Sequence, residues 1–116
     1  MKKSVKGNVS ADLLRGHTDT IILKILSKGD SYGYDICNQI LEKTGKEFEL
    51  KEATLYSSFR RLEESGCISP YWGNETQGGR RRYYKITAHG KQMLEKNLED
   101  WRFTNKILQL LFEEDI

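Results

Sequence analysis

KEATLYSSFRRLEESG, residues 51–66, is the stretch that decides the fold of this chain. Leu55, Phe59 and Leu62 recur in it at steps of four and three, which is the spacing of a buried stripe on a helix. Polar side chains fall on the other faces, namely Thr54, Ser57, Ser58, Arg60 and Arg61. Gly66 supplies the left-handed residue at which helices commonly stop. The stretch therefore predicts one amphipathic helix with a polar face.

The segment that follows predicts a two-stranded hairpin. Residues 68–72 and 80–86 are rich in aromatic and β-branched side chains, which favour strands. The turn residues between them are Asn74, Gly78 and Gly79. Pro70 restricts the first strand to the edge of a sheet, because proline donates no backbone hydrogen bond. Arg80, Arg81 and Arg82 alternate in direction along the second strand, so all three cannot face one partner.

A helix sized for a major groove beside a hairpin rich in arginine is what binding to duplex DNA requires. Thr54 and Ser57 suit bases or phosphates, while Tyr56 and Lys51 suit phosphates. We expect the following residues at the duplex: Lys51, Thr54, Tyr56, Ser57, Arg60, Gln77, Gly78, Gly79, Arg80, Arg81 and Arg82. The alternative is a surface hairpin whose arginines are merely solvated.

Three groups of residues carry a family resemblance. They are Glu52-Ala53-Thr54-Leu55-Tyr56, then Arg61-Leu62-Glu63 with Gly66, then Gly78-Gly79-Arg80-Arg81 with Tyr83, Tyr84 and Thr87. Together they resemble the signature of the PadR family of winged-helix transcriptional repressors. The resemblance extends upstream through residues 29–34, GDSYGY, and so covers most of the chain. The single C-terminal helix resembles the small, often drug-responsive branch of that family.

This resemblance implies an α+β, mostly α fold, with a winged helix-turn-helix domain in residues 1–87 and a dimerisation helix in residues 88–116. It implies a homodimeric DNA-binding regulator, of repressor type, that reads a near-palindromic operator. Lys51 departs from the pattern, since it stands where a capping side chain would help the helix begin. A winged-helix module that binds protein or RNA is the alternative of another class.

The distribution of charge agrees with such a division. The whole chain has 116 residues and a net charge of only +2. Residues 46–91 hold nine Lys and Arg against six Asp and Glu, whereas residues 92–116 hold three against six. A basic middle suits a nucleic-acid face, and an acidic end suits a different task. At 37% hydrophobic residues, one domain has only a small core, which a partner subunit would supplement.

Two further helices are expected upstream. The first runs from Ser10, its cap, to Lys28. The second begins after Ser31, runs to Thr44 and is ended by a glycine, and Gly33 in its first turn suggests close packing against a neighbour. Residues 47–50 alternate between glutamate and apolar side chains, which predicts a short strand that joins the hairpin as a third member.

The last helix is expected from Ala88 to about Phe112, with Thr87 as its cap. Its apolar positions form what we call the seam: Leu94, Leu98, Trp101, Asn105, Leu108 and Phe112. Their steps of four and three are typical of a coiled coil, so we expect this helix to pair with that of a second chain, with Asn105 setting the register. The alternative is that the helix packs back on its own domain.

Trp101 in the middle of the seam also suggests a ligand site. Two indoles facing each other across a dimer axis would hold the helices apart. With the first helix of the partner chain, they would enclose a flat cavity for a planar hydrophobic or cationic compound. The expected ligand residues are Leu13, His17, Asp19, Thr20, Trp101 and Asn105. The alternative is that Trp101 only anchors the dimer.

Other chemistry has no support in the sequence. His17 and His89 stand apart from any cysteine pair, and no phosphate loop, zinc spacing or nucleophile with its base is present. We therefore expect no enzyme, no metal and no cofactor. Without a long apolar run, the expected location is the cytoplasm and no membrane partner is expected. Cys37 and Cys67 are expected to be plain buried thiols.

Overall fold

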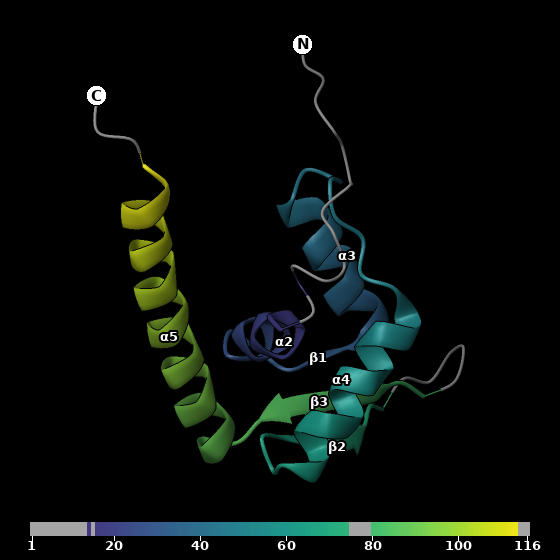
Figure 1. The fold of residues 1–116 in the computed structure, drawn as a ribbon. Coiled ribbons are helices and arrows are strands. Elements are labelled where there is room, and N and C mark those ends of the chain that lie inside the picture. The colour runs from purple at the N-terminus through teal and green to yellow at the C-terminus, as the bar shows by residue number, and fades with distance from the viewer. Residues whose placement is uncertain (1–13, 15, 75–79, 114–116) are drawn as a thin grey trace.

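The computed structural model describes residue 14, residues 16–74 and residues 80–113. This part of the chain holds four helices and three strands (Figure 1). In chain order they are α2 (Thr18–Leu26), β1 (Ser31–Tyr32), α3 (Gly33–Lys43), α4 (Glu52–Glu64), β2 (Ile68–Trp72), β3 (Arg82–Ile86) and α5 (Ala88–Phe112). The predicted α+β, mostly helical winged fold with a long last helix is confirmed.

The first predicted helix is interrupted at Gly16 and His17 and ends earlier than expected. Within the described residues, Gly16 and His17 form a turn, and α2 begins after His17 and ends at Leu26, two residues before Lys28. The turn is closed by a hydrogen bond of 2.8 Å from the His17 amide to the Leu14 carbonyl oxygen. Glycine is among the poorest helix formers, which explains an interruption at this position. The expected cap, Ser10, lies outside the described residues.

The third strand is not the predicted one. Residues 48–51 have no regular structure, and β1 instead pairs with β3 through Ser31↔Tyr84 and Tyr32↔Tyr83. The sheet is antiparallel with the order β1-β3-β2, so β3 already has a neighbour on both sides. The alternating apolar residues at 48 and 50 therefore have a different task, since Leu50 is buried and Phe48 packs against the core.

Several local predictions are confirmed. α5 runs over the predicted residues 88–112, and the Gly90 amide donates a hydrogen bond of 3.0 Å to the Thr87 side chain, which caps the helix. Gly66 has a positive φ of 77° after α4, and Gly45 one of 63° after α3. Pro70 lies on β2, which is an edge strand. β3 begins at Arg82, two residues later than the predicted second strand.

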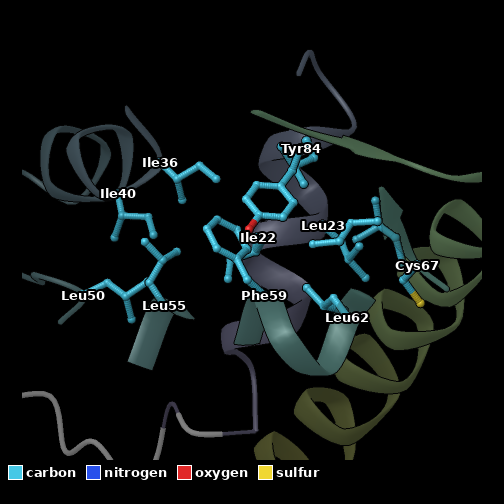
Figure 2. Packing of buried hydrophobic residues seen from close by; sticks show 13 residues of the cluster. Ile22, Leu23, Ile36, Ile40, Leu50, Leu55, Phe59, Leu62, Cys67 and Tyr84 are labelled. Atoms are coloured by element: carbon cyan, nitrogen blue, oxygen red, sulfur yellow. The ribbon is translucent and has the colours of Figure 1, made fainter. Parts of the chain in front are cut away.

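The core is built around α2 and α4 (Figure 2). The buried apolar residues come from all four helices, from β2 and β3 and from two loops, and those labelled in the view include Ile22, Leu23, Ile36, Ile40, Leu50, Leu55, Phe59, Leu62, Cys67 and Tyr84. The Phe59 ring of α4 stacks on the Tyr84 ring of β3 with centroids 4.0 Å apart. Burying each such side chain stabilises the fold by about 1.5–3 kcal/mol, so this stacking fixes α4 against the sheet.

The first half of α5 packs on the domain, and its second half extends beyond it. Figure 1 shows it beginning beside the sheet, passing α2 and then continuing without a neighbour. Leu94 is 7% exposed and belongs to the core, and Leu98 packs against that core. All residues from 101 to 112, which we call the arm, are exposed. The first two members of the seam therefore pack on their own domain, whereas the others are uncovered within the described part of the chain.

Candidate nucleic-acid interface and interhelical groove

One face of α4 is anchored and the other is open. Leu55, Ser58, Phe59 and Leu62 are buried, which adds Ser58 to the predicted stripe. Most of the predicted contact residues on this helix are exposed: Lys51, Thr54, Tyr56 and Arg60, with Ser57 half-buried. Ala53, one helical turn before Ser57, is also exposed and is not among the predicted residues. Lys51 is the N-cap and makes no side-chain cap hydrogen bond, as its departure from the pattern suggested.

Tyr56 fixes the angle between α3 and α4. Its ring meets Phe59 edge to face at 5.9 Å, and its hydroxyl lies over Gly33 at the start of α3. A Cβ at Gly33 would come within 3.3 Å of that hydroxyl and within 3.2 Å of Leu55 Cδ2. The close packing predicted at Gly33 is therefore confirmed, and it joins the two helices of the helix-turn-helix.

The three hairpin arginines point in different directions. The Arg82 guanidinium lies 5.6 Å from the buried Tyr84 ring and 3.3 Å from the Glu63 carboxylate, so it faces α4. Arg81 lies over the Tyr32 ring on β1 at 4.7 Å, on the opposite face of the sheet. The alternation predicted for these residues is therefore present.

A cation–π pair stands next to the tip of the hairpin, where β2 ends. The Arg80 guanidinium lies 5.3 Å from the ring of Trp72, and both residues are exposed. This arginine is therefore held close to the end of β2 while its charge remains accessible to a polyanion. The predicted tip residues, Gln77, Gly78 and Gly79, lie outside the described residues.

Tyrosines brace the outer face of the sheet. Tyr83 stands between Tyr32 and Tyr71 on the neighbouring strands, at 5.2 Å and 5.6 Å between ring centroids. The Tyr71 hydroxyl donates a hydrogen bond of 2.7 Å to the Asp30 carboxylate. This hydrogen bond raises the pKa of Tyr71 to about 12. The hairpin is thereby tied to the loop before β1.

Asp19 faces α4. Its carboxylate accepts two hydrogen bonds from the Arg61 guanidinium, one of 2.8 Å from Nη2 and one of 3.2 Å from Nε. The same Nη2 donates a hydrogen bond of 2.9 Å to the hydroxyl of the buried Ser58. The hydrogen bond to Asp19 raises the pKa of Arg61 above its ordinary value. This arrangement, the Asp19–Arg61 clamp, joins α2 to α4.

Four of the predicted ligand residues lie together. His17, Thr20, Trp101 and Asn105 line a groove of about 440 Å³ between the start of α2 and the middle of α5. Both walls come from one chain, whereas the prediction took the first helix from a partner. Asp19 is not among the lining residues, and Leu13 lies outside the described residues. We call this hollow the polar groove.

Residues that were not predicted complete the polar groove. They are Gly16, Asn97, Asp100, Thr104 and Leu108. The Asn97 side-chain amide donates a hydrogen bond of 2.9 Å to the Thr20 hydroxyl, which joins the two walls. Asp100 supplies the carboxylate that had been expected from Asp19, and it also pairs with Lys96 at 2.9 Å. The signal for both was the helix period, since Asn97 lies four residues before Trp101 and Asp100 lies three residues after Asn97.

A larger hollow adjoins the polar groove. It has a volume of about 1060 Å³ between α2, the end of α3 and α5, and shares His17, Thr20 and Trp101 with the polar groove. Its apolar wall consists of Leu14, Ile21, Ile25, Ile40, Phe48, Leu98 and Trp101. Lysines and glutamates stand at its rim, including Lys24 and Glu47. We call it the apolar hollow.

The described residues also bear on metal binding, on membrane spans and on the two cysteines. In the described ranges, no three His, Cys, Asp or Glu side chains gather as a metal site would require, and no helix there is long and apolar enough to cross a membrane. Cys67 is buried, and Cys37 is half-buried with its thiol 3.6 Å from the Leu50 carbonyl oxygen. Burial raises the pKa of the Cys37 thiol, which lowers its reactivity.

Comparison with known proteins identifies the family. The model of the transcriptional regulator PadR-like family matches residues 22–96. The structure is similar to that of a transcriptional regulator from Clostridium thermocellum, with 45% sequence identity and a TM-score of 0.83 over 90% of this chain and 99% of that one. A PadR family transcription regulator from Clostridium difficile R20291 is 41% identical, with a TM-score of 0.75 over 84% of this chain and 100% of that one.

One relative in sequence has a function stated in its name. The negative transcriptional regulator PadR of Bacillus subtilis is 32% identical over 82 residues, which are 69% of this chain. Those residues span only 42% of that regulator's length. The predicted resemblance is thus confirmed at the level of the family, while the drug-responsive branch stays a prediction. The chain belongs to the transcriptional regulator PadR-like family.

Proposed function

We propose that this protein is a homodimeric repressor that binds a near-palindromic operator, with α4 of each subunit in a major groove and the hairpin on the flanking backbone. The observation that carries the proposal is the exposed polar face of α4, on a helix whose other face is locked into the core. A rigid helix with an open face beside a basic hairpin suits duplex readout. The Bacillus subtilis relative, named a negative regulator, supports the repressor role.

Roles in DNA binding follow from exposure and reach. Thr54 and Ser57 are assigned to base edges, and Lys51 and Tyr56 to phosphates near the start of α4. Arg60 continues the contact one turn further. Of the hairpin residues, Arg80 is assigned to phosphate, together with Gln77, Gly78 and Gly79 at the tip. Arg82 faces Glu63, so we assign it to holding the hairpin against α4.

Dimerisation is assigned to the arm. Trp101, Leu108 and Phe112 of the seam are exposed, as are Ile107, Leu110 and Leu111 on its second apolar flank. Soluble monomers rarely expose contiguous apolar surface of this kind. A two-fold dimer would cover it, since the arm of each subunit would lie against the apolar hollow and the arm of the other. On this view residues 1–87 read the operator and residues 88–116 join the subunits, with Leu94 tying the last helix to its own domain.

The polar groove suggests how the repressor would be released from DNA. Trp101 offers a flat aromatic wall and Asp100 a carboxylate, which together suit a planar hydrophobic or cationic compound. Such an effector would release DNA only through a higher affinity for a dimer whose two α4 helices are wrongly spaced.

The test is selection of bound sequences from a random duplex pool, followed by mobility shifts with the selected duplex and with its single strands. We expect a sequence with two-fold symmetry and weak binding of either single strand. Replacing Thr54 and Ser57 by alanine should reduce affinity for the selected duplex by about 1–3 kcal/mol per lost base contact and leave random duplex nearly unchanged. Equal binding to duplex and single strand would instead support a protein- or RNA-binding module.

A further inference from the structure

We infer that Asp19 is a positioning residue for DNA recognition: through Arg61 it holds α4 at a fixed place relative to α5, and so sets the separation of the two recognition helices. The inference rests on the proposed function, because it concerns how a dimer spaces its two copies of α4. Asp19 itself would touch no DNA.

The contact has the geometry of a rigid link. Two guanidinium nitrogens of Arg61 meet both oxygens of one carboxylate, and the partners are 42 residues apart in the chain. Paired charge-assisted hydrogen bonds of this kind fix orientation as well as distance. Because the same Nη2 of Arg61 also donates to the hydroxyl of the fully buried Ser58, the guanidinium is held against α4 as well as against α2. The Asp19–Arg61 clamp therefore restrains the position of α4 relative to α2.

The other side of α2 is fixed to α5. Thr20 follows Asp19 directly, and consecutive residues of a helix point about 100° apart. Its hydroxyl accepts a hydrogen bond of 2.9 Å from Asn97 of α5. Figure 1 shows α2 between α4 and α5, and its residues Ile22 and Leu23 are fully buried. α2 is thus a packed spacer whose two polar links connect the arm-bearing helix to the recognition helix.

Arg61 differs from its neighbour on α4. Its charge is paired with Asp19, and its side chain is 55% exposed. Arg60 is also exposed and makes no ion pair within the described part of the chain. A phosphate contact adds about 0.9 to the slope of affinity against salt, on logarithmic axes. Arg60 and Arg61 therefore form a matched pair: the first should carry a phosphate contact and the second should not.

The experiment measures affinity for the operator and for the same operator with one base pair inserted between its half-sites. The variants are Asp19→Asn, Arg61→Gln, the double variant and the control Arg60→Ala, each at several salt concentrations. Asp19→Asn and Arg61→Gln should each weaken operator binding about three- to ten-fold, with no further loss in the double variant. They should also reduce the penalty of the inserted base pair. Their salt slope should equal that of the wild type, while Arg60→Ala lowers it by about 0.9.

These readouts separate the inference from simpler roles. Loss of folded protein would weaken both duplexes equally and leave the insertion penalty unchanged, and that result would overturn the inference; circular dichroism reports the folded fraction of each variant. A salt slope that falls in Arg61→Gln as it does in Arg60→Ala would make Arg61 a phosphate contact and likewise overturn it. If the wild type binds no duplex with sequence preference, the proposed function fails first, and the positioning role falls with it.

Discussion

α4 and α5 are both amphipathic helices with one exposed face, and the exposed faces differ in kind. The apolar stripe of α4 is wholly covered by the domain, so what remains outside is polar. The stripe of α5 is covered only through Leu94 and Leu98, so what remains outside is apolar. A helix that has used its apolar face for its own fold is available to a polar partner such as DNA. One whose apolar face is left over requires a protein partner.

The largest expected effect is on stability, and it compares a buried phenylalanine of α4 with an exposed phenylalanine of α5. Phe59→Ala on α4 should lower the free energy of unfolding by about 3–5 kcal/mol, because the ring is 2% exposed and stacks on Tyr84. Phe112→Ala on α5 removes the same group from a side chain that is 75% exposed. At a dilution where subunits are separate, it should change stability by less than about 0.5 kcal/mol. Urea unfolding of both variants checks this, and similar losses would mean that the arm has cover within its own chain.

The next effect concerns assembly. Leu108 is 40% exposed in the single chain and would be buried in the proposed dimer. Leu108→Asp should weaken dimerisation by roughly 3–5 kcal/mol, because it buries a charge without a partner. Light scattering should then show monomers with the wild-type helix content and no tight operator binding. Arg102→Ala, on the same exposed stretch of α5 but outside the seam, is the control and should remain dimeric. Dimers of Leu108→Asp would place the interface elsewhere.

A smaller effect is expected from a compound in the polar groove. In a Trp72→Phe background, a planar cationic dye should quench Trp101, which is 48% exposed, in a saturable way. Occupancy should lower operator affinity by about 1–3 kcal/mol. Such dyes also bind DNA, so Trp101→Ala is the necessary control: release of DNA that persists in this variant comes from the dye on the duplex. If no dye quenches Trp101 in a dimer that still binds DNA, Trp101 is only an anchor of the dimer.

The smallest effect distinguishes the hairpin arginines. Replacing Arg80, Arg81 and Arg82 together by alanine should weaken all duplexes, with the salt slope falling by about 0.9 per lost contact. Among the single variants, Arg80→Ala should change that slope, and Arg82→Ala should leave it nearly unchanged because its partner is Glu63. Affinity measured against salt concentration provides the check. An unchanged slope in the triple variant would exclude the hairpin from the interface.

Much of the fold was predictable because it depends on contacts close in sequence. Thr87 caps α5 through the amide of Gly90, three residues away, and Gly66 ends α4 with its positive φ. The stripe of Leu55, Phe59 and Leu62 is likewise a property of one helix. The strand predicted at residues 47–50 was wrong because alternation shows only that every second side chain is buried. It does not show whether a strand edge is available, and β1 occupies the one beside β3.

The candidate site divides in the same way. The exposed face of α4 follows from the helix period, and so does the place of Trp101 and Asn105 on one side of α5. The partner of Asp19 did not follow, since Arg61 lies 42 residues further along the chain. The first helix, predicted to line the site from a partner chain, also lines a groove beside α5 of its own chain.

The sequence by itself determined α4, the hairpin, α5 with its Thr87 cap, the family and the polar character of the α4 face, because these rest on short-range periodicity and on single-residue backbone preferences. Only the tertiary structure decided which surfaces are buried within the domain and which remain exposed. It placed Leu94 in the core and left Leu108 outside, and it turned Asp19 toward α4 while Thr20 turned to α5. The physical reason is that a helix period fixes the direction of a side chain about its own axis, whereas its partner depends on how distant segments pack together.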